Sequence, residues 1–160
     1  MEALLFTAAG GQYLAPLSDL DEVLMPARLR PLARAPDFLV GVLDLRGGSL
    51  PVLDLAERLG QAGSRDQARI SPAGWRPGHR ILRFQAGGLA LGAIVESVTG
   101  IRTLTAAQRR ESVVRDAADR GFLGDLWPVD GRLTQAIRFA RLLAPAELAL
   151  LLHGGTGADA

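Results

Sequence analysis

The chain has 160 residues, 48% of them hydrophobic, which is enough apolar material for one domain with a substantial core. All 18 of its cationic side chains are arginine, and the chain also has 17 Asp and Glu residues. The resulting formal net charge of +1 argues against a non-specific phosphate-binding surface. The absence of cysteine excludes disulfides and thiolate chemistry, and the absence of a long apolar run or a basic-then-apolar leader predicts a cytoplasmic protein without membrane insertion.

Short apolar runs separated by turn residues dominate the first 60 residues and predict β-structure. Gly10-Gly11 marks a hairpin turn between two such runs. A short helix is predicted after Ser18, because this residue can cap a helix, acids fill the first turn and Pro26 stops it. The expected elements are strands at 3–8, 12–17, 41–45 and 49–53, a short helix at 18–24 and a helical turn at 55–59.

The second part of the chain shows the same pattern of short apolar runs separated by turn residues. It is preceded by residues 60–78, which are rich in Gly, Ser, Pro, Arg and Gln and predict a long surface loop. Asp130-Gly131 is a good hairpin signal, and Pro145 can open a final helix. The expected elements are strands at 79–84, 89–95, 98–104, 122–129 and 133–139, a polar stretch at 105–120 and a helix at 146–152.

About ten short strands at close spacing indicate an all-β protein with a few short helices. We expect a single domain over residues 1–152, made of two small β-barrel lobes that divide near the 60–78 loop, and a flexible tail at 153–160. Closed barrels would remove the exposed edges of such apolar strands. Periodicity alone leaves the choice between barrel and sandwich open.

A search for catalytic or metal-binding groups finds no cluster of titratable residues. His79 and His153 are isolated and are expected at the surface, no histidine pair has ligand spacing, and no serine lies in a nucleophile elbow. The glycine pairs lack the Lys-Ser/Thr and helix that would make them phosphate loops. The sequence therefore predicts no enzyme activity, no catalytic residue, no metal site and no cofactor.

Arg46 lies where the chain reverses between the strands at 41–45 and 49–53, followed by Gly47 and Gly48. A tight hairpin usually has a small polar residue at its turn, so a large cation there is either a solvated charge or a binding residue. Glu22 should project from the flank of the predicted helix, where its carboxylate could pair with a guanidinium.

Residues 36–55 contain a Pro-x-Phe start, a Gly-Val-x-x-Leu-Arg-Gly centre and a Pro-Val-x-Asp-Leu close. This stretch resembles the signature of CheW, the family of bacterial chemotaxis coupling proteins. Three further blocks extend the resemblance over roughly residues 3–152. These blocks are Leu20-Asp21-Glu22-Val23 after Tyr13, residues 89–98 with Glu96 for the usual Asp, and Phe122-Leu123-Gly124 with Asp130-Gly131 and 133–143.

Two stretches depart from the family pattern. Residues 133–138 are more polar than usual in the family, and residues 60–78 match none of its motifs.

The resemblance implies two intertwined five-stranded barrels that act as a scaffold. Family members bind the cytoplasmic tip of chemoreceptors in a groove between the lobes, and a CheA-type histidine kinase on a separate face. This implies a cytoplasmic protein at membrane-bound receptor arrays, with no nucleic acid partner and with a Glu22–Arg46 pair at the groove. The kinase-facing residues do not transfer by position. The implied receptor groove comprises Leu20, Glu22, Val23, Arg46, Gly47 and Ile101.

Other functions remain open at this stage. A CheW-like scaffold could serve a receptor–kinase pathway that does not control flagella. A β-barrel enzyme would be revealed by thermal shifts with metals or nucleotides. An OB-like barrel that binds nucleic acid would show salt-dependent affinity for oligonucleotides.

Overall fold

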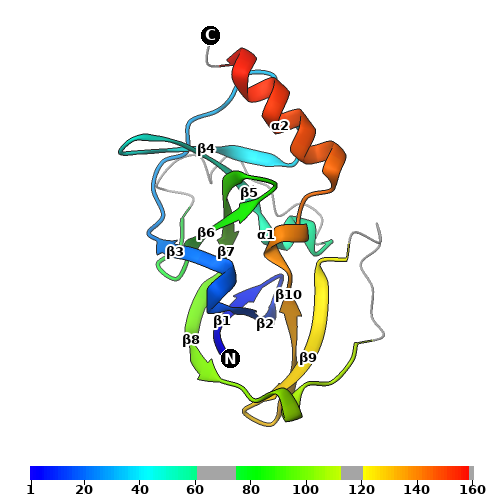
Figure 1. Cartoon of the computed structure of the whole chain (residues 1–160). Coiled ribbons are helices and arrows are strands. Elements are labelled where there is room, and N and C mark those ends of the chain that lie inside the picture. The colour runs from blue at the N-terminus through cyan, green and yellow to red at the C-terminus, as the bar shows by residue number, and fades with distance from the viewer. Residues whose placement is uncertain (61–74, 113–120, 159–160) are drawn as a thin grey trace.

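The computed structural model describes residues 1–60, 75–112 and 121–158 (Figure 1). Strands dominate it, and most of them lie within a residue or two of the ranges expected from the sequence. The elements are β1 (Glu2–Ala8), β2 (Gly11–Pro16), β3 (Leu20–Leu24), β4 (Leu39–Leu45), β5 (Gly48–Asp54), α1 (Leu55–Arg58), β6 (Arg80–Ala86), β7 (Leu89–Val95), β8 (Ser97–Thr103), β9 (Leu123–Val129), β10 (Arg132–Ile137) and α2 (Pro145–Ala158).

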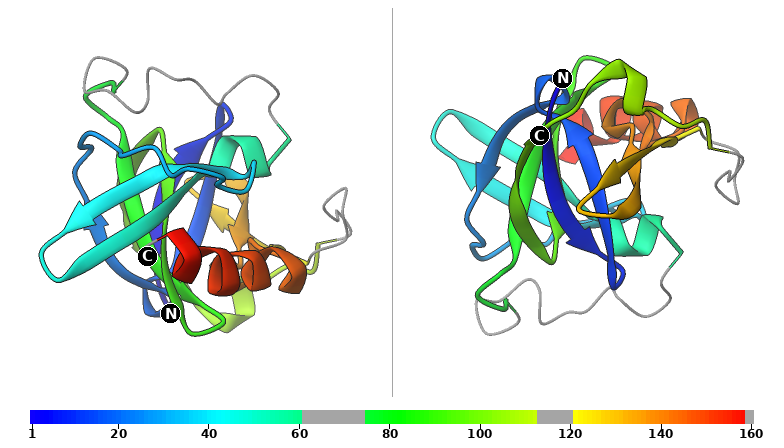
Figure 2. Two further views of the ribbon diagram at one scale, coloured as in Figure 1. Left: turned by 90° about the horizontal axis from the view of Figure 1, so that it is seen from above. Right: turned by 90° about the horizontal axis from the view of Figure 1, so that it is seen from below.

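The strands form two five-stranded sheets. The first sheet has the order β8-β1-β2-β10-β9 and the second the order β3-β6-β7-β5-β4. Neighbouring strands are antiparallel except for one parallel pair in each sheet, β2 with β10 and β5 with β7. The chain thus begins in the first sheet, passes through the second and returns to the first, so the two halves are intertwined (Figures 1 and 2).

Two expectations about the architecture were wrong. The sheets are not closed into barrels, since each strand order ends in two edge strands. The boundary between the two lobes also does not fall at residues 60–78, because β6 and β7 follow this segment and yet pair with the strands that precede it. Strand patterns locate strands, but closure and partner choice depend on contacts between distant segments.

A central core lies between the two sheets, and each sheet has a further core of its own. In β1, Leu4 and Phe6 face the central core, whereas Ala3 and Leu5 face the core of the first sheet. In β5, Val52 faces the core of the second sheet, and its neighbour Leu53 faces the central core. Both faces of these strands are buried, which explains why they are continuous apolar runs in the sequence.

Helix α2 closes one side of the second sheet and lies alongside the β4–β5 hairpin (Figures 1 and 2). It extends beyond the helix at 146–152 that was expected from the sequence. Its first turn is attached to α1 by the ion pair between Arg58 Nη2 and Glu147 Oε2, at 2.6 Å. Glu147 Oε1 also accepts the backbone N–H of Ala144, as an N-terminal capping group does. These contacts fix α2 against the body of the protein.

Candidate protein-binding site

Residues 20–24 form an edge strand of the second sheet, not the helix expected from Ser18 and the acids after it. Ser18 lies inside a 3₁₀ turn at Leu17–Asp19, which has no side-chain cap, and the chain then becomes extended. β3 pairs antiparallel with β6, placing Glu22 opposite Arg83 and Val23 opposite Leu82. Pairing with a strand far along the chain therefore overrides the local helix signals.

Glu22 forms an ion pair on this edge, but with Arg83 of β6 and not with Arg46. The Nη1 atom of Arg83 lies 3.3 Å from Oε1 of Glu22, with half of the Glu22 side chain exposed. No ion pair joins Glu22 to Arg46 in the described ranges, so the pairing implied by the family resemblance is not formed. Asp21 of the same strand accepts a hydrogen bond from Gln85 Nε2 at 2.8 Å. The charged groups of β3 are thus ordered by β6.

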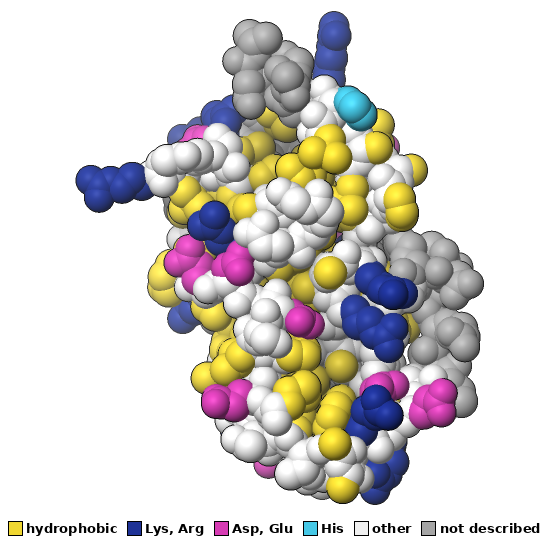
Figure 3. All heavy atoms as spheres, viewed as in Figure 1, with side chains coloured by type: hydrophobic (Ala, Val, Ile, Leu, Met, Phe, Trp, Pro, Cys, Tyr) yellow, Lys and Arg dark blue, Asp and Glu magenta, His cyan; other side chains and the backbone are white. Residues whose placement is uncertain are grey.

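The β4–β5 hairpin carries Arg46 at its exposed tip, and a basic side chain protrudes there in Figure 3. Gly47 has φ +92°, a left-handed conformation that side chains resist, which explains a glycine at this position of the turn. Arg46 forms no ion pair with the described residues. Its guanidinium is therefore available to a partner.

Asp44, just before this tip, is neutralised by a different arginine. Arg30 Nε donates to Asp44 Oδ2 at 3.1 Å, and the Ser49 hydroxyl donates to Oδ1 at 3.2 Å. The hydrogen bond from Arg30 is the main cause that holds the pKa of the Asp44 carboxyl below its usual value; desolvation opposes it, and the hydrogen bond from Ser49 and the charge of Arg30 add to it. Arg46 therefore contributes an uncompensated positive charge at the tip.

Exposed apolar side chains lie on two edge strands. Val23 of β3 is 45% exposed and Ile101 of β8 is 52% exposed, while Leu20 is half-buried and packs against the central core. β3 and β8 are edges of different sheets and lie on the same side of the molecule in Figure 1. Both side chains are thus accessible to a partner.

The six residues of the implied receptor groove come from three separate places in the fold. Leu20, Glu22 and Val23 share β3, and Ile101 belongs to the other sheet. Arg46 and Gly47 lie in the hairpin, and β6 and β7 separate β3 from β5 in the sheet order. No hydrogen bond or ion pair between described residues joins the three groups. Any common role for them requires a partner that spans these places.

Sequence patterns did not identify the two arginines that pair with Glu22 and Asp44. Arg83 is the cation that pairs with Glu22, and its only sequence signal is a charge within the apolar run of β6. Arg30 pairs with Asp44 because an isolated bridge joins its backbone to Val42 of β4. Neither pairing can be found without the strand register.

The two histidines lie in different environments. His79 was expected at the surface, but it is only 6% exposed, and its Nδ1 accepts the backbone N–H of Arg76 at 2.9 Å. His153 is exposed near the described end of the chain.

Across residues 1–60, 75–112 and 121–158, no three His, Asp or Glu side chains are grouped to hold a metal ion. In the same ranges, no helix combines the length and hydropathy of a membrane span.

The geometry defines an all-β protein of two intertwined five-stranded sheets with exposed apolar and charged edge strands. The family model for the CheW-like domain matches residues 2–147, and the chain belongs to this family of scaffolding proteins. The resemblance noted from the sequence is thereby confirmed.

Known relatives agree with this assignment. The chain is 27% identical to the chemotaxis protein CheW of Klebsiella aerogenes, over 94% of this chain and 86% of the relative. It is 36% identical to protein FrzA of Myxococcus xanthus over 58% of this chain and 52% of that protein. The crystal structure of the scaffolding protein TtCheW from Thermoanaerobacter tengcongensis has the same fold, with a TM-score of 0.73, 23% identity and coverage of 88% and 90% of the two chains.

Proposed function

We propose that this chain is an adaptor that binds the cytoplasmic tip of chemoreceptors and a CheA-type histidine kinase, and so couples one to the other. The observation that carries the proposal is the match of the CheW-like domain over residues 2–147. An adaptor with two sites on one rigid body raises the effective concentration of each partner for the other. It has no catalytic step and works in the cytoplasm, at receptor arrays attached to the membrane.

The receptor site in this proposal comprises the exposed groups on β3, the hairpin tip and β8. Val23 and Ile101 supply exposed aliphatic surface, which a helical receptor tip can bury. Glu22, Arg83 and Arg46 supply charges at its margin that orient the bound helix. Leu20 packs beneath the strand, and Gly47 shapes the turn that presents Arg46. The kinase-binding residues are not assigned.

The receptor site is tested by pull-down with receptor-containing membranes from the same organism. Val23→Asp and Ile101→Asp place a carboxylate in the proposed apolar contact and should each reduce receptor binding at least about tenfold. Leu133→Asp is the matched control, since Leu133 is 61% exposed on β10 and lies outside the proposed site. Equal loss in all three variants, or in none, would remove the assignment of the site.

The pathway served is a separate question. CheW-like scaffolds also act in receptor–kinase pathways that do not control flagella, so that alternative stays open. Deletion of the gene, followed by assays of swimming and of surface motility, separates the two. Loss of directed swimming supports the flagellar pathway, and a defect confined to the other output supports the alternative.

A further inference from the structure

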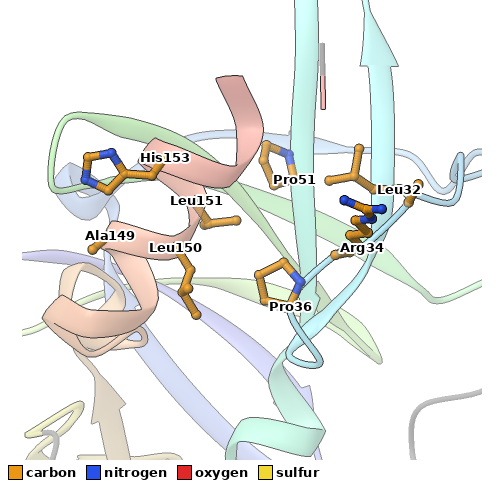
Figure 4. A pocket seen from close by; sticks show the side chains of 10 residues that line it. Leu32, Arg34, Pro36, Pro51, Ala149, Leu150, Leu151 and His153 are labelled. Carbon is orange, nitrogen blue, oxygen red and sulfur yellow. The ribbon is translucent and has the colours of Figure 1, made fainter. Parts of the chain in front are cut away.

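An apolar groove of about 290 Å³ lies between α2 and the β4–β5 hairpin, and it shares no residue with the proposed receptor site (Figure 4). One wall is α2, from which Leu150 and Leu151 face the gap. The other wall is formed by Leu32 and Pro36 of the segment before β4 and by Pro51 of β5. Figure 3 shows hydrophobic side chains gathered over this region of the surface.

The groove is exposed and its walls are fixed. Leu150 is 56% exposed and faces the groove, whereas Leu151 is buried and anchors α2 in the central core. The Arg58–Glu147 ion pair holds the start of the same helix. On the opposite wall, the backbone N–H of Ala35 donates to the carbonyl of Leu32 at 3.2 Å. A partner would therefore meet a preformed surface.

Arg34 gives the groove its electrostatic character. Its guanidinium forms no ion pair or side-chain hydrogen bond with any described residue, and no Asp or Glu is among the described residues that line the groove. The backbone of Arg34 also has φ +59°, the left-handed region that non-glycine residues seldom adopt. An unpaired cation is thus held in a strained turn beside aliphatic surface, a combination associated with binding sites.

We infer that the groove binds a short amphipathic helix of a partner protein, with aliphatic side chains on one face and at least one carboxylate beside them. The aliphatic side chains would fill the space between Leu150 and Pro51, and the carboxylate would pair with Arg34. The volume lies just below the range for small-molecule pockets, about 300–1,000 Å³, and suits two or three side chains better than a whole ligand.

Two other occupants fit less well. A nucleic acid would require several cations, and Arg34 is the only arginine among the described residues that line the groove. A second copy of this chain could offer the apolar face of its own α2. The single acid of the described part of α2, Glu147, is however already paired with Arg58 at 2.6 Å. The helix of a second copy therefore brings no free carboxylate to Arg34.

The test selects helical 14-residue peptides from a display library on the full chain, after depletion on the Leu150→Asp variant. Enriched peptides should combine aliphatic residues at helical spacing with acids. Fluorescence anisotropy should then show binding that Arg34→Glu and Leu150→Asp each weaken at least about tenfold and that Arg34→Lys retains. Affinity should also fall as salt rises.

Matched controls are available on β10, in the other sheet. Leu133→Asp and Arg132→Glu make the same chemical changes at exposed positions outside the groove and should leave peptide affinity within about twofold. Melting temperatures of all variants show whether they fold, and receptor pull-down should be unaffected by Arg34→Glu. This separates failure of the groove from failure of the adaptor proposal.

Several outcomes would overturn the inference. They are enrichment of basic or neutral peptides, peptides that bind Arg34→Glu as well as the parent, and the absence of any peptide that distinguishes the parent from Leu150→Asp. Sedimentation showing a dimer that Leu150→Asp dissociates would assign the groove to a second copy instead.

Discussion

Glu22 and Arg83 are 61 residues apart in sequence, yet their charged atoms lie 3.3 Å apart because β3 and β6 pair antiparallel. The pair is exposed to water, so its contribution to the stability of the fold is small. A partner that covers β3 would exclude this water and strengthen every charge–charge contact beneath it. We therefore expect these side chains to matter more for binding than for folding.

Substitution of the pair tests this expectation. Glu22→Ala and Arg83→Ala should each lower the free energy of unfolding by only about 0–1 kcal/mol, while receptor binding falls several-fold. In a double-mutant cycle, Glu22 and Arg83 should show coupling because they are in contact, whereas Glu22 and Arg46 should be additive. Denaturant unfolding and receptor pull-down supply both measurements. Coupling between Glu22 and Arg46 in the absence of receptor would contradict the geometry.

The carboxyl of Asp44 gives a second prediction at the same scale. Because Arg30 lowers its pKa in the folded state, the pair stabilises the protein at pH values above the pKa of an unfolded Asp, about 3.9. That stabilisation should be lost as the pH falls through the lower pKa of the folded state.

Arg30→Ala should therefore raise the pKa of Asp44 toward its usual value, as followed by NMR titration. The stability difference between parent and variant should shrink as the solution is acidified. Arg46→Ala is the control, since this arginine does not contact Asp44. An unchanged Asp44 pKa in Arg30→Ala would show that the hydrogen bond is not formed in solution.

At the scale of elements, the β4–β5 hairpin was predicted closely from its sequence and β3 was not. Two apolar runs on either side of a glycine turn specify the hairpin locally, and Gly47 has the positive φ that the turn requires. The helix expected at 18–24 also rested on local signals, Ser18 and the acids that follow. Ser18 instead lies inside a 3₁₀ turn without a side-chain cap, and the pairing of β3 with β6 makes the residues after it extended.

Substitution at the hairpin turn tests the backbone argument. Gly47→Val should destabilise the protein by about 1–3 kcal/mol, because a β-branched residue is strained at φ +92°. Gly48→Val is the matched control. It adds the same side chain one residue later, where φ is not positive and no atom lies within 4 Å of the added Cβ. Equal melting temperatures for the two variants would show that the turn does not impose the strain.

For the whole molecule, the sequence predicted the class of fold and most of its strands, but not how the strands assemble. The parallel pairs β2–β10 and β5–β7 join segments far apart in the chain, and they decide that each half contributes to both sheets. The candidate site was also only partly predictable from the sequence, because its ion pairs depend on how the strands pair. Arg46 and Glu22 could be named from the family signature, whereas Arg83 and Arg30 became visible only when strand register placed them beside carboxylates.

The intertwined arrangement has a consequence for the adaptor proposal. β3 and β8 belong to different sheets, but the central core packs both sheets together through residues such as Phe6 and Phe84. A receptor bound across these edges would therefore contact one rigid unit, and a kinase bound elsewhere on that unit would be held at a fixed distance from it. Such a scaffold loses little entropy when the second partner binds.

The most direct test of this account is co-sedimentation of a cognate CheA-type kinase with receptor-containing membranes, with and without this protein. The account predicts that the fraction of kinase in the pellet rises several-fold when the protein is added, and that Val23→Asp and Ile101→Asp remove the increase while Leu133→Asp does not. If the kinase pellets equally with and without the protein, or if the protein binds neither partner, the account is contradicted.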